Sequence, residues 1–112
     1  MSGERLNAGL LVGACLRAAV AQGKLAAVLR KGDPDSGMIF VKALARNGTA
    51  VLYTQTRDDT GESAWRRAAG PAPEADIDQR LDREANIDRD LWAVEILDDA
   101  LAHPLDPKLV DR

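Results

Sequence analysis

Two strand-like segments joined by Asn47-Gly48 constrain this chain more than any other feature. Residues 38–45 alternate in a way that places successive side chains on opposite faces of a strand. Residues 49–56 are rich in Thr, Val and Tyr, which favour strands. Asn-Gly between two such runs is a strong hairpin signal and predicts a type I′ turn. The pattern therefore predicts an antiparallel hairpin.

The rest of the chain adds two strands and two helices. The apolar run at residues 25–29 precedes a turn-rich segment and predicts a third strand of an antiparallel meander. Residues 74–87 predict a helix, with Pro73 at its start and acidic residues in its first turns. Residues 91–97 alternate again and predict the last strand. We expect a loop at residues 57–73, held to the domain by the aromatic side chain within it.

These elements predict an α+β fold in the order α-β-β-β-α-β. We expect a four-stranded, mostly antiparallel sheet with two packed helices, and a mixed sheet is the alternative. The chain has 112 residues, of which 46% are hydrophobic and 29% charged, as in an ordinary globular domain. We assign an N-terminal extension to residues 1–5, one domain to 6–98, and an irregular or partly disordered tail to 99–112.

The apolar N-terminal segment has two interpretations. Val12-Gly13-Ala14-Cys15 resembles a lipoprotein cleavage box, and an A-x-A pattern follows shortly after it. However, Arg17 interrupts the segment, which is too short to span a membrane. We favour a buried helix that ends at Gln22-Gly23, with the single cysteine as a buried, inert thiol.

Charge is divided unevenly along the chain. Residues 1–67 hold 10 basic and 6 acidic side chains, whereas residues 68–112 hold 5 basic and 12 acidic ones. We expect the two parts to complement each other within one domain. Because Glu74, Asp76 and Asp78 begin the second helix and would repel phosphate, we expect no nucleic acid as a partner.

No recognised set of catalytic or metal-binding residues is present. Asp33-x-Asp35-x-Gly37 resembles the start of a calcium loop, but its fifth and twelfth positions are Gly37 and Leu44. His103 is the only histidine, and we expect it to be solvated in the tail. We therefore predict no cofactor and no metal, and favour a protein that is not an enzyme.

Three co-linear motifs resemble a known family. They are Arg30-x-Gly-Asp-Pro-Asp-x-Gly-x-Ile-Phe-Val-Lys42, Gly48-x-Ala-x-Leu-Tyr53 and Asp88-x-Asp-Leu-Trp-x-Val-Glu-Ile96. The chain resembles a small, mainly alphaproteobacterial family known only as domain of unknown function fourteen ninety-one. The resemblance implies a compact domain in the cytoplasm, and no known activity or cofactor. It points to a candidate functional surface at Arg30, Asp33, Asp35, Lys42, Asp90, Trp92 and Glu95.

Two hypotheses of function follow. The first is a non-enzymatic protein-interaction or accessory module that uses the sheet face or an edge strand to bind a protein partner or itself, without contact to a membrane. The alternative is a small-ligand or enzymatic site built from charged residues near the turn at residues 32–37 and the sheet face. Lys42 and Glu95 are charged within otherwise apolar strands, and we favour a structural ion pair between them over a site.

Overall fold

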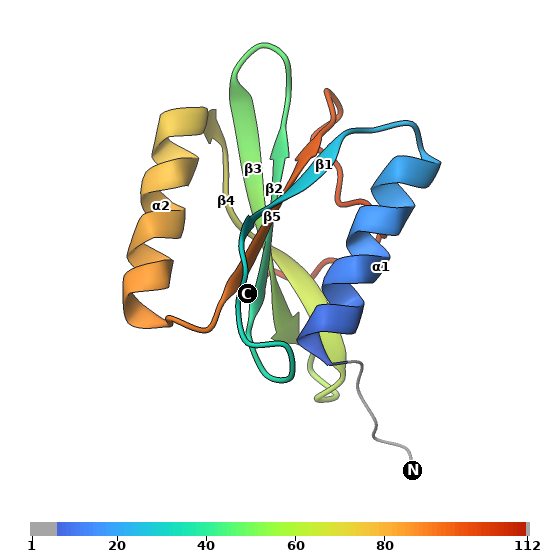
Figure 1. Ribbon diagram of the computed structural model, residues 1–112, viewed down its shortest axis with the longest axis vertical. Helices are drawn as coiled ribbons and strands as arrows, with labels where there is room; N and C mark the ends of the chain where they lie inside the picture. Colours follow the sequence, from blue (N-terminus) through green and yellow to red (C-terminus); the bar gives the residue numbers. More distant parts are fainter. Residues whose placement is uncertain (1–6, 112) are drawn as a thin grey trace.

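The computed structural model describes residues 7–111, so the expected N-terminal extension at residues 1–5 lies outside the described part. Within these residues, two helices lie on opposite faces of one five-stranded sheet (Figure 1). The expected α+β class is therefore confirmed, with one strand more than expected. In chain order the elements are α1 (Ala8–Ala21), β1 (Ala26–Arg30), β2 (Ile39–Leu44), β3 (Thr49–Arg57), β4 (Ser63–Pro73), α2 (Glu74–Ile87) and β5 (Trp92–Leu97).

The additional strand is β4, and the expectation of a loop at residues 57–73 was wrong. β4 pairs antiparallel with β3 and contains two irregularities in register. Glycine and proline in this segment concealed it, because both residues are rare inside strands. They are tolerated here because β4 lies at the edge of the sheet. Trp65 of this strand is buried in the core, where it holds the segment to the domain as expected.

The strand order β1-β5-β2-β3-β4 also corrects the expected meander. The chain does reverse direction between β1 and β2, but the two strands do not pair. Instead β5 lies between them, antiparallel to β1 and parallel to β2. The sheet is therefore mixed, as the alternative allowed, although three of its four strand pairings are antiparallel as expected. The prediction failed because it paired strands that are neighbours in sequence.

The hairpin between β2 and β3 is confirmed, but its turn is not of type I′. The Ala45 N–H donates to the Thr49 carbonyl over 2.9 Å, and the Gly48 N–H donates to the Ala45 carbonyl over 3.0 Å. Gly48 has a φ of 89°, whereas Asn47 is not among the residues with positive φ. A type I′ turn needs positive φ at both central residues. The connection is a three-residue loop in which glycine alone takes the left-handed conformation.

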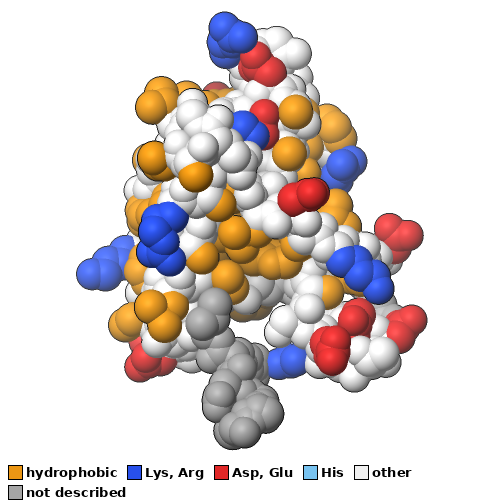
Figure 2. Space-filling view, turned by 90° about the vertical axis from the view of Figure 1, so that its right-hand side faces the viewer, with side chains coloured by type: hydrophobic (Ala, Val, Ile, Leu, Met, Phe, Trp, Pro, Cys, Tyr) orange, Lys and Arg blue, Asp and Glu red, His pale blue; other side chains and the backbone are white. Residues whose placement is uncertain are grey.

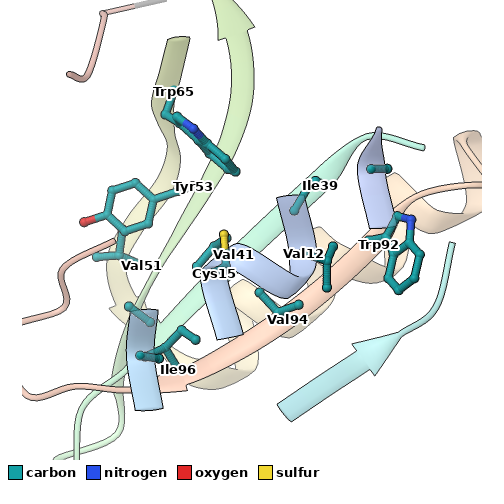
Figure 3. Packing of buried hydrophobic residues seen from close by; sticks show 13 residues of the cluster. Val12, Cys15, Ile39, Val41, Val51, Tyr53, Trp65, Trp92, Val94 and Ile96 are labelled. Atoms are coloured by element: carbon teal, nitrogen blue, oxygen red, sulfur yellow. The ribbon is translucent and has the colours of Figure 1, made fainter. Parts of the chain in front are cut away.

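The main core lies between α1 and the sheet. Figure 3 shows Val12 and Cys15 of α1 beside Val41 of β2 and Val94 of β5, all of them buried. Asn7 caps the helix, because its side chain accepts a 2.9 Å hydrogen bond from the Leu10 N–H. Cys15 is buried as expected, and this burial raises the pKa of its thiol to about 11.

The two helices are displaced along the sheet relative to each other. α1 contacts β1 and β5, whereas α2 packs mainly on β3 and β4 of the opposite face. Ile77 and Leu81 of α2 bury themselves against Phe40 and Leu52 in the second core. On this face Leu91 and Ala93 at β5 also belong to the second core, so β1 is the strand without a helix directly above it.

The segment after β5 is irregular, yet it packs on the sheet. Leu101 and Leu105 contact the main core, and the Val110 N–H donates to the Trp65 carbonyl over 2.9 Å. His103 is only 5% exposed, so the expectation of a solvated histidine was wrong. The imidazole ring of His103 contacts the rings of Trp65 and Tyr53, whose centroids lie 4.2 and 5.5 Å from its own. Among the described residues, no helix has both the length and the apolar character needed to cross a membrane.

Candidate functional site

Lys42 is the centre of a charged cluster on the α2 face of the sheet. Its Nζ lies 2.6 Å from Asp78 Oδ1 and 2.7 Å from Glu74 Oε2, both on α2. It also lies 3.2 Å from Glu95 Oε2 on the neighbouring strand β5, where Lys42 and Glu95 are in direct register. The cross-strand pair that the sequence suggested is therefore present, and two helical carboxylates extend it.

The cluster carries more negative than positive charge. The Lys42 side chain is only 3% exposed, whereas its three carboxylate partners keep partial access to solvent. Burial lowers the pKa of Lys42, but the hydrogen bonds to Asp78, Glu74 and Glu95 outweigh burial and raise the pKa above its ordinary value. One ammonium group among three carboxylates leaves a net charge of −2.

A second group of candidate residues meets where the turn before β2 touches the start of β5. The Asp33 N–H donates to the Asp90 carbonyl over 2.9 Å, and the Trp92 Nε1–H donates to the Asp33 carbonyl over 2.8 Å. Arg30 Nη2 donates to the Arg89 carbonyl over 3.0 Å. These contacts join the first and last of the three sequence motifs, and all of them use backbone carbonyls.

One oxygen of the Asp33 carboxylate is engaged within the turn itself. Asp33 Oδ2 accepts hydrogen bonds from the Ser36 N–H, the Ser36 hydroxyl and the Asp35 N–H, and these lower the pKa of Asp33. A Cβ on Gly32 or Gly37 would lie 2.2 or 2.1 Å from the Asp90 carbonyl oxygen. The two glycines are therefore required for the close approach of the turn to β5.

The candidate surface thus divides into two places. Arg30, Asp33, Asp90 and Trp92 meet at the turn, whereas Lys42 and Glu95 lie further along the sheet. Asp35 is exposed, and its carbonyl accepts a 3.5 Å hydrogen bond from the Ala8 N–H at the start of α1. Nothing in residues 7–111 forms a group of three or more His, Cys, Asp or Glu side chains suited to a metal ion.

A groove lies between α2, β5 and the edge strand β1. Its volume is about 400 Å³. The Arg30 Nε beside it is buried and has no hydrogen-bond partner among the described residues. The groove is lined by Leu29 and Arg30 of β1, Leu91 and Ala93 at β5, and Asp78, Leu81, Asp82 and Ala85 of α2.

The groove borders the open edge of the sheet. Leu25 is 72% exposed and Leu29 is 48% exposed, and both belong to or adjoin β1. Leu97 of the neighbouring strand donates its N–H to the Leu25 carbonyl over 2.9 Å. Since backbone groups alternate along an antiparallel strand, those of Ala26 and Val28 point away from β5, towards the open edge. This edge is the part of the sheet best placed to receive another strand.

The other edge strand, β4, is partly closed. A parallel bridge links its Trp65 to Leu109, and Pro71 and Pro73 have no N–H to offer a further strand.

Sequence reasoning missed two parts of this surface and one buried residue elsewhere. Glu74 and Asp78 were interpreted only as acids at a helix start, although their spacing of four residues places them on one helix face. The open edge could not be identified while β1 was paired with β2. His103 was missed because its segment is polar, although Leu101 and Leu105 around it signal contact with a core.

Similarity to known proteins agrees with the sequence motifs. The family model described as "Protein of unknown function (DUF1491)" matches residues 6–106. A comparison with curated proteins found no match. The crystal structure of a DUF1491 family protein from Caulobacter crescentus CB15 is 36% identical, with 95% of this chain and 100% of that chain covered and a TM-score of 0.87.

Two solution structures are also similar. Protein Atu0922 from A. tumefaciens is 32% identical, with 97% of this chain and 98% of that chain covered and a TM-score of 0.82. An NMR structure of a DUF1491 family protein from Caulobacter crescentus CB15 is 36% identical, with 97% and 100% covered and a TM-score of 0.84. Both organisms are alphaproteobacteria. The chain belongs to the DUF1491 family, whose function is unknown.

Proposed function

We propose that this protein is a non-enzymatic interaction module that binds an extended segment of a partner protein along β1. The observation that carries the proposal is the open edge of β1, which offers unpaired backbone groups at Ala26 and Val28 beside exposed leucines. An extended segment that adds to a sheet edge gains main-chain hydrogen bonds, and its alternate side chains contact the surface beside that edge. The groove under α2 provides such a surface.

The outer face of α1 is a weaker choice for the same role. Leu10 and Val20 are exposed there, and Figure 2 shows hydrophobic side chains spread over this side of the molecule with charged ones between and around them. Single exposed apolar residues are common on protein surfaces. β1 differs because exposed apolar side chains and unpaired backbone groups occur together.

The small-ligand alternative has less support. It requires Arg30, Asp33, Lys42 and Glu95 to converge, but the Asp33 carboxylate is engaged by Ser36 and the turn. The Lys42 ammonium group already faces Glu74, Asp78 and Glu95, so it is not available to hold an anionic ligand. We further propose that the protein acts in the cytoplasm. We also propose that it does not bind nucleic acid, because the acids at the start of α2 face Lys42 and disfavour phosphate.

The test is affinity capture from the source bacterium, followed by amide hydrogen exchange on the complex. Proline at position 28 removes one outward N–H, and an edge strand tolerates proline where its N–H faces solvent. We expect Val28→Pro and Leu29→Lys to lose the captured partner, whereas Leu10→Lys, on the exposed face of α1, keeps it. We also expect the bound partner to slow exchange at Ala26 and Val28.

A partner that binds Val28→Pro as well as the unmodified protein would exclude β1 as its binding site. Far-UV circular dichroism of each variant provides the folding control. Equal loss of the partner in Leu10→Lys would shift the interaction surface to α1.

A further inference from the structure

We infer that the segment bound along β1 carries a lysine or arginine between apolar residues, with the cation in the row of Ala27. This inference rests on the proposed function and specifies the chemistry of the partner. It is carried by the register of the strands and by the charge of the Lys42 cluster.

The register places four residues in one row across the α2 face. Ala27 of β1 lies opposite Glu95 of β5, Glu95 lies opposite Lys42 of β2, and Lys42 lies opposite Leu52 of β3. A strand added outside β1 would place one of its residues next to Ala27 in this row. The methyl group of Ala27 is short, so a long side chain from the added strand can pass over it towards Glu95.

The end of that path attracts a cation. Glu95 keeps 22% of its side chain exposed and is the most distant of the three partners of Lys42. The Lys42 cluster has a net charge of −2, because one ammonium group faces three carboxylates. An added ammonium or guanidinium group would meet the unneutralised part of that charge at the border of the groove, where Asp78 also lies.

The exposed leucines that flank Ala27 favour apolar residues on either side of the cation in the bound segment. Leu25, two residues before Ala27, and Leu29, at the irregularity in register between Val28 and Arg30, are both exposed and would pack against apolar side chains of the added segment. Arg30 and Lys31 follow this stretch, so positive charge is disfavoured at that end of the segment, whereas Lys24 before the stretch already pairs with Asp98 over 2.7 Å.

The same cations argue against a second copy as the occupant. Antiparallel pairing of two β1 strands would bring Arg30 and Lys31 of one copy to the end of the other copy that carries Lys24, which is paired with Asp98. Like charges placed side by side across strands are destabilising.

The experiment uses three capped nine-residue peptides that alternate valine and threonine and differ only at the central residue. That residue is lysine, norleucine or glutamate, so the central side chain shares a face with valines. Binding to the ¹⁵N-labelled protein is followed by chemical-shift titration, and Val28→Pro establishes that the peptide binds at the edge. We expect the lysine peptide to bind roughly threefold more tightly than the norleucine peptide, in keeping with a partly exposed ion pair. The glutamate peptide should bind most weakly.

Two variants that each remove one negative charge test whether the preference for lysine depends on Glu95. Glu95→Gln removes the proposed carboxylate partner, and Lys42 retains Glu74 and Asp78. Asp76→Asn changes an exposed acid on α2 that does not line the groove. We expect Glu95→Gln to abolish the preference for lysine and Asp76→Asn to preserve it.

Each result bears on one of the two claims. If the three peptides bind the β1 edge equally, the inferred chemistry is wrong and the proposed function stands. If none binds, the proposed strand addition fails as well. Sedimentation that shows a dimer of the unmodified protein, with Val28→Pro monomeric, would replace the cationic segment with a second copy.

Discussion

Trp92 and Asp33 lie 59 positions apart in sequence, and the indole Nε1–H of Trp92 donates a 2.8 Å hydrogen bond to the Asp33 carbonyl. This bond fixes the turn before β2 to the start of β5. We expect Trp92→Phe to lower the free energy of unfolding by about 1 kcal/mol more than Trp65→Phe, because only Trp92 loses an indole hydrogen bond within residues 7–111. Urea unfolding followed by circular dichroism measures both. Equal losses would show that this bond contributes nothing.

Gly37 should tolerate no side chain. In Gly37→Ala the new Cβ would lie 2.1 Å from the Asp90 carbonyl oxygen, so the turn or β5 must move. We expect a loss of about 3 kcal/mol or more in the free energy of unfolding, or failure to fold. Gly23→Ala is the control, since Gly23 has a φ of 77° with open space around it and should cost only about 1 kcal/mol. Similar losses in the two variants would contradict the close approach to β5.

Lys42 should matter more for stability than an exposed cation does. Lys42→Met leaves Glu74, Asp78 and Glu95 facing one another without the ammonium group, and we expect a loss of about 2 kcal/mol in unfolding free energy. Arg46→Met breaks an exposed ion pair with Asp99 and should change stability little. A small effect of Lys42→Met would indicate that water replaces the ammonium group readily.

His103 should make stability depend on pH. Burial lowers the pKa of His103 from 6.5 to about 4, so the folded protein holds the neutral ring where the unfolded chain already binds a proton. Protonation of the unfolded chain therefore lowers the free energy of unfolding. The loss is absent above pH 6.5 and reaches roughly 3 kcal/mol as the pH falls towards 4.

The control for that pH dependence is His103→Asn. Asparagine can keep an acceptor for the Leu105 N–H, which now donates to His103 Nδ1 over 3.0 Å, but it does not titrate. We expect urea unfolding between pH 7.5 and 4.5 to show a steeper loss in the unmodified protein than in the variant. Parallel curves would exclude His103 as the cause.

Cys15 should be inert in the folded protein. Its thiol is buried and has a pKa of about 11, so almost no reactive thiolate exists at pH 8. We expect a thiol reagent to label the protein at a rate limited by unfolding, and to label it rapidly in concentrated urea. Rapid labelling without denaturant would show that α1 leaves the sheet easily.

Local patterns predicted the elements well where the side chains carry a clear period. Residues 74–87 form α2 as expected, and residues 91–97 differ from β5 by one residue. These segments obey local rules: proline and acids at a helix start, and alternation along a strand. β4 breaks those rules because an edge strand needs only one partner, and its register irregularities absorb Gly70 and Pro71.

Long-range arrangement could not be obtained in the same way. The pairing of β1 with β5 depends on contacts between distant parts of the chain, which no local pattern encodes. The motif residues Arg30, Asp33, Asp90 and Trp92 were identified by resemblance. Only the structure shows that the side chains of Arg30 and Trp92 and the backbones of Asp33 and Asp90 hold the turn. The pair of Lys42 and Glu95 was predictable once the two strands were placed side by side, but the helical carboxylates were not.

The central place of β5 has a consequence for synthesis of the protein on the ribosome. Because β5 joins β1 to β2, the growing chain cannot assemble the middle of its sheet until residues 92–97 have left the exit tunnel. Until then the hairpin of β2 and β3 exposes the strand edge that β5 later covers. Such pairings between distant segments close slowly and leave edges open to aggregation. The middle of the sheet should therefore form only after β5 has emerged, whichever elements have formed before it.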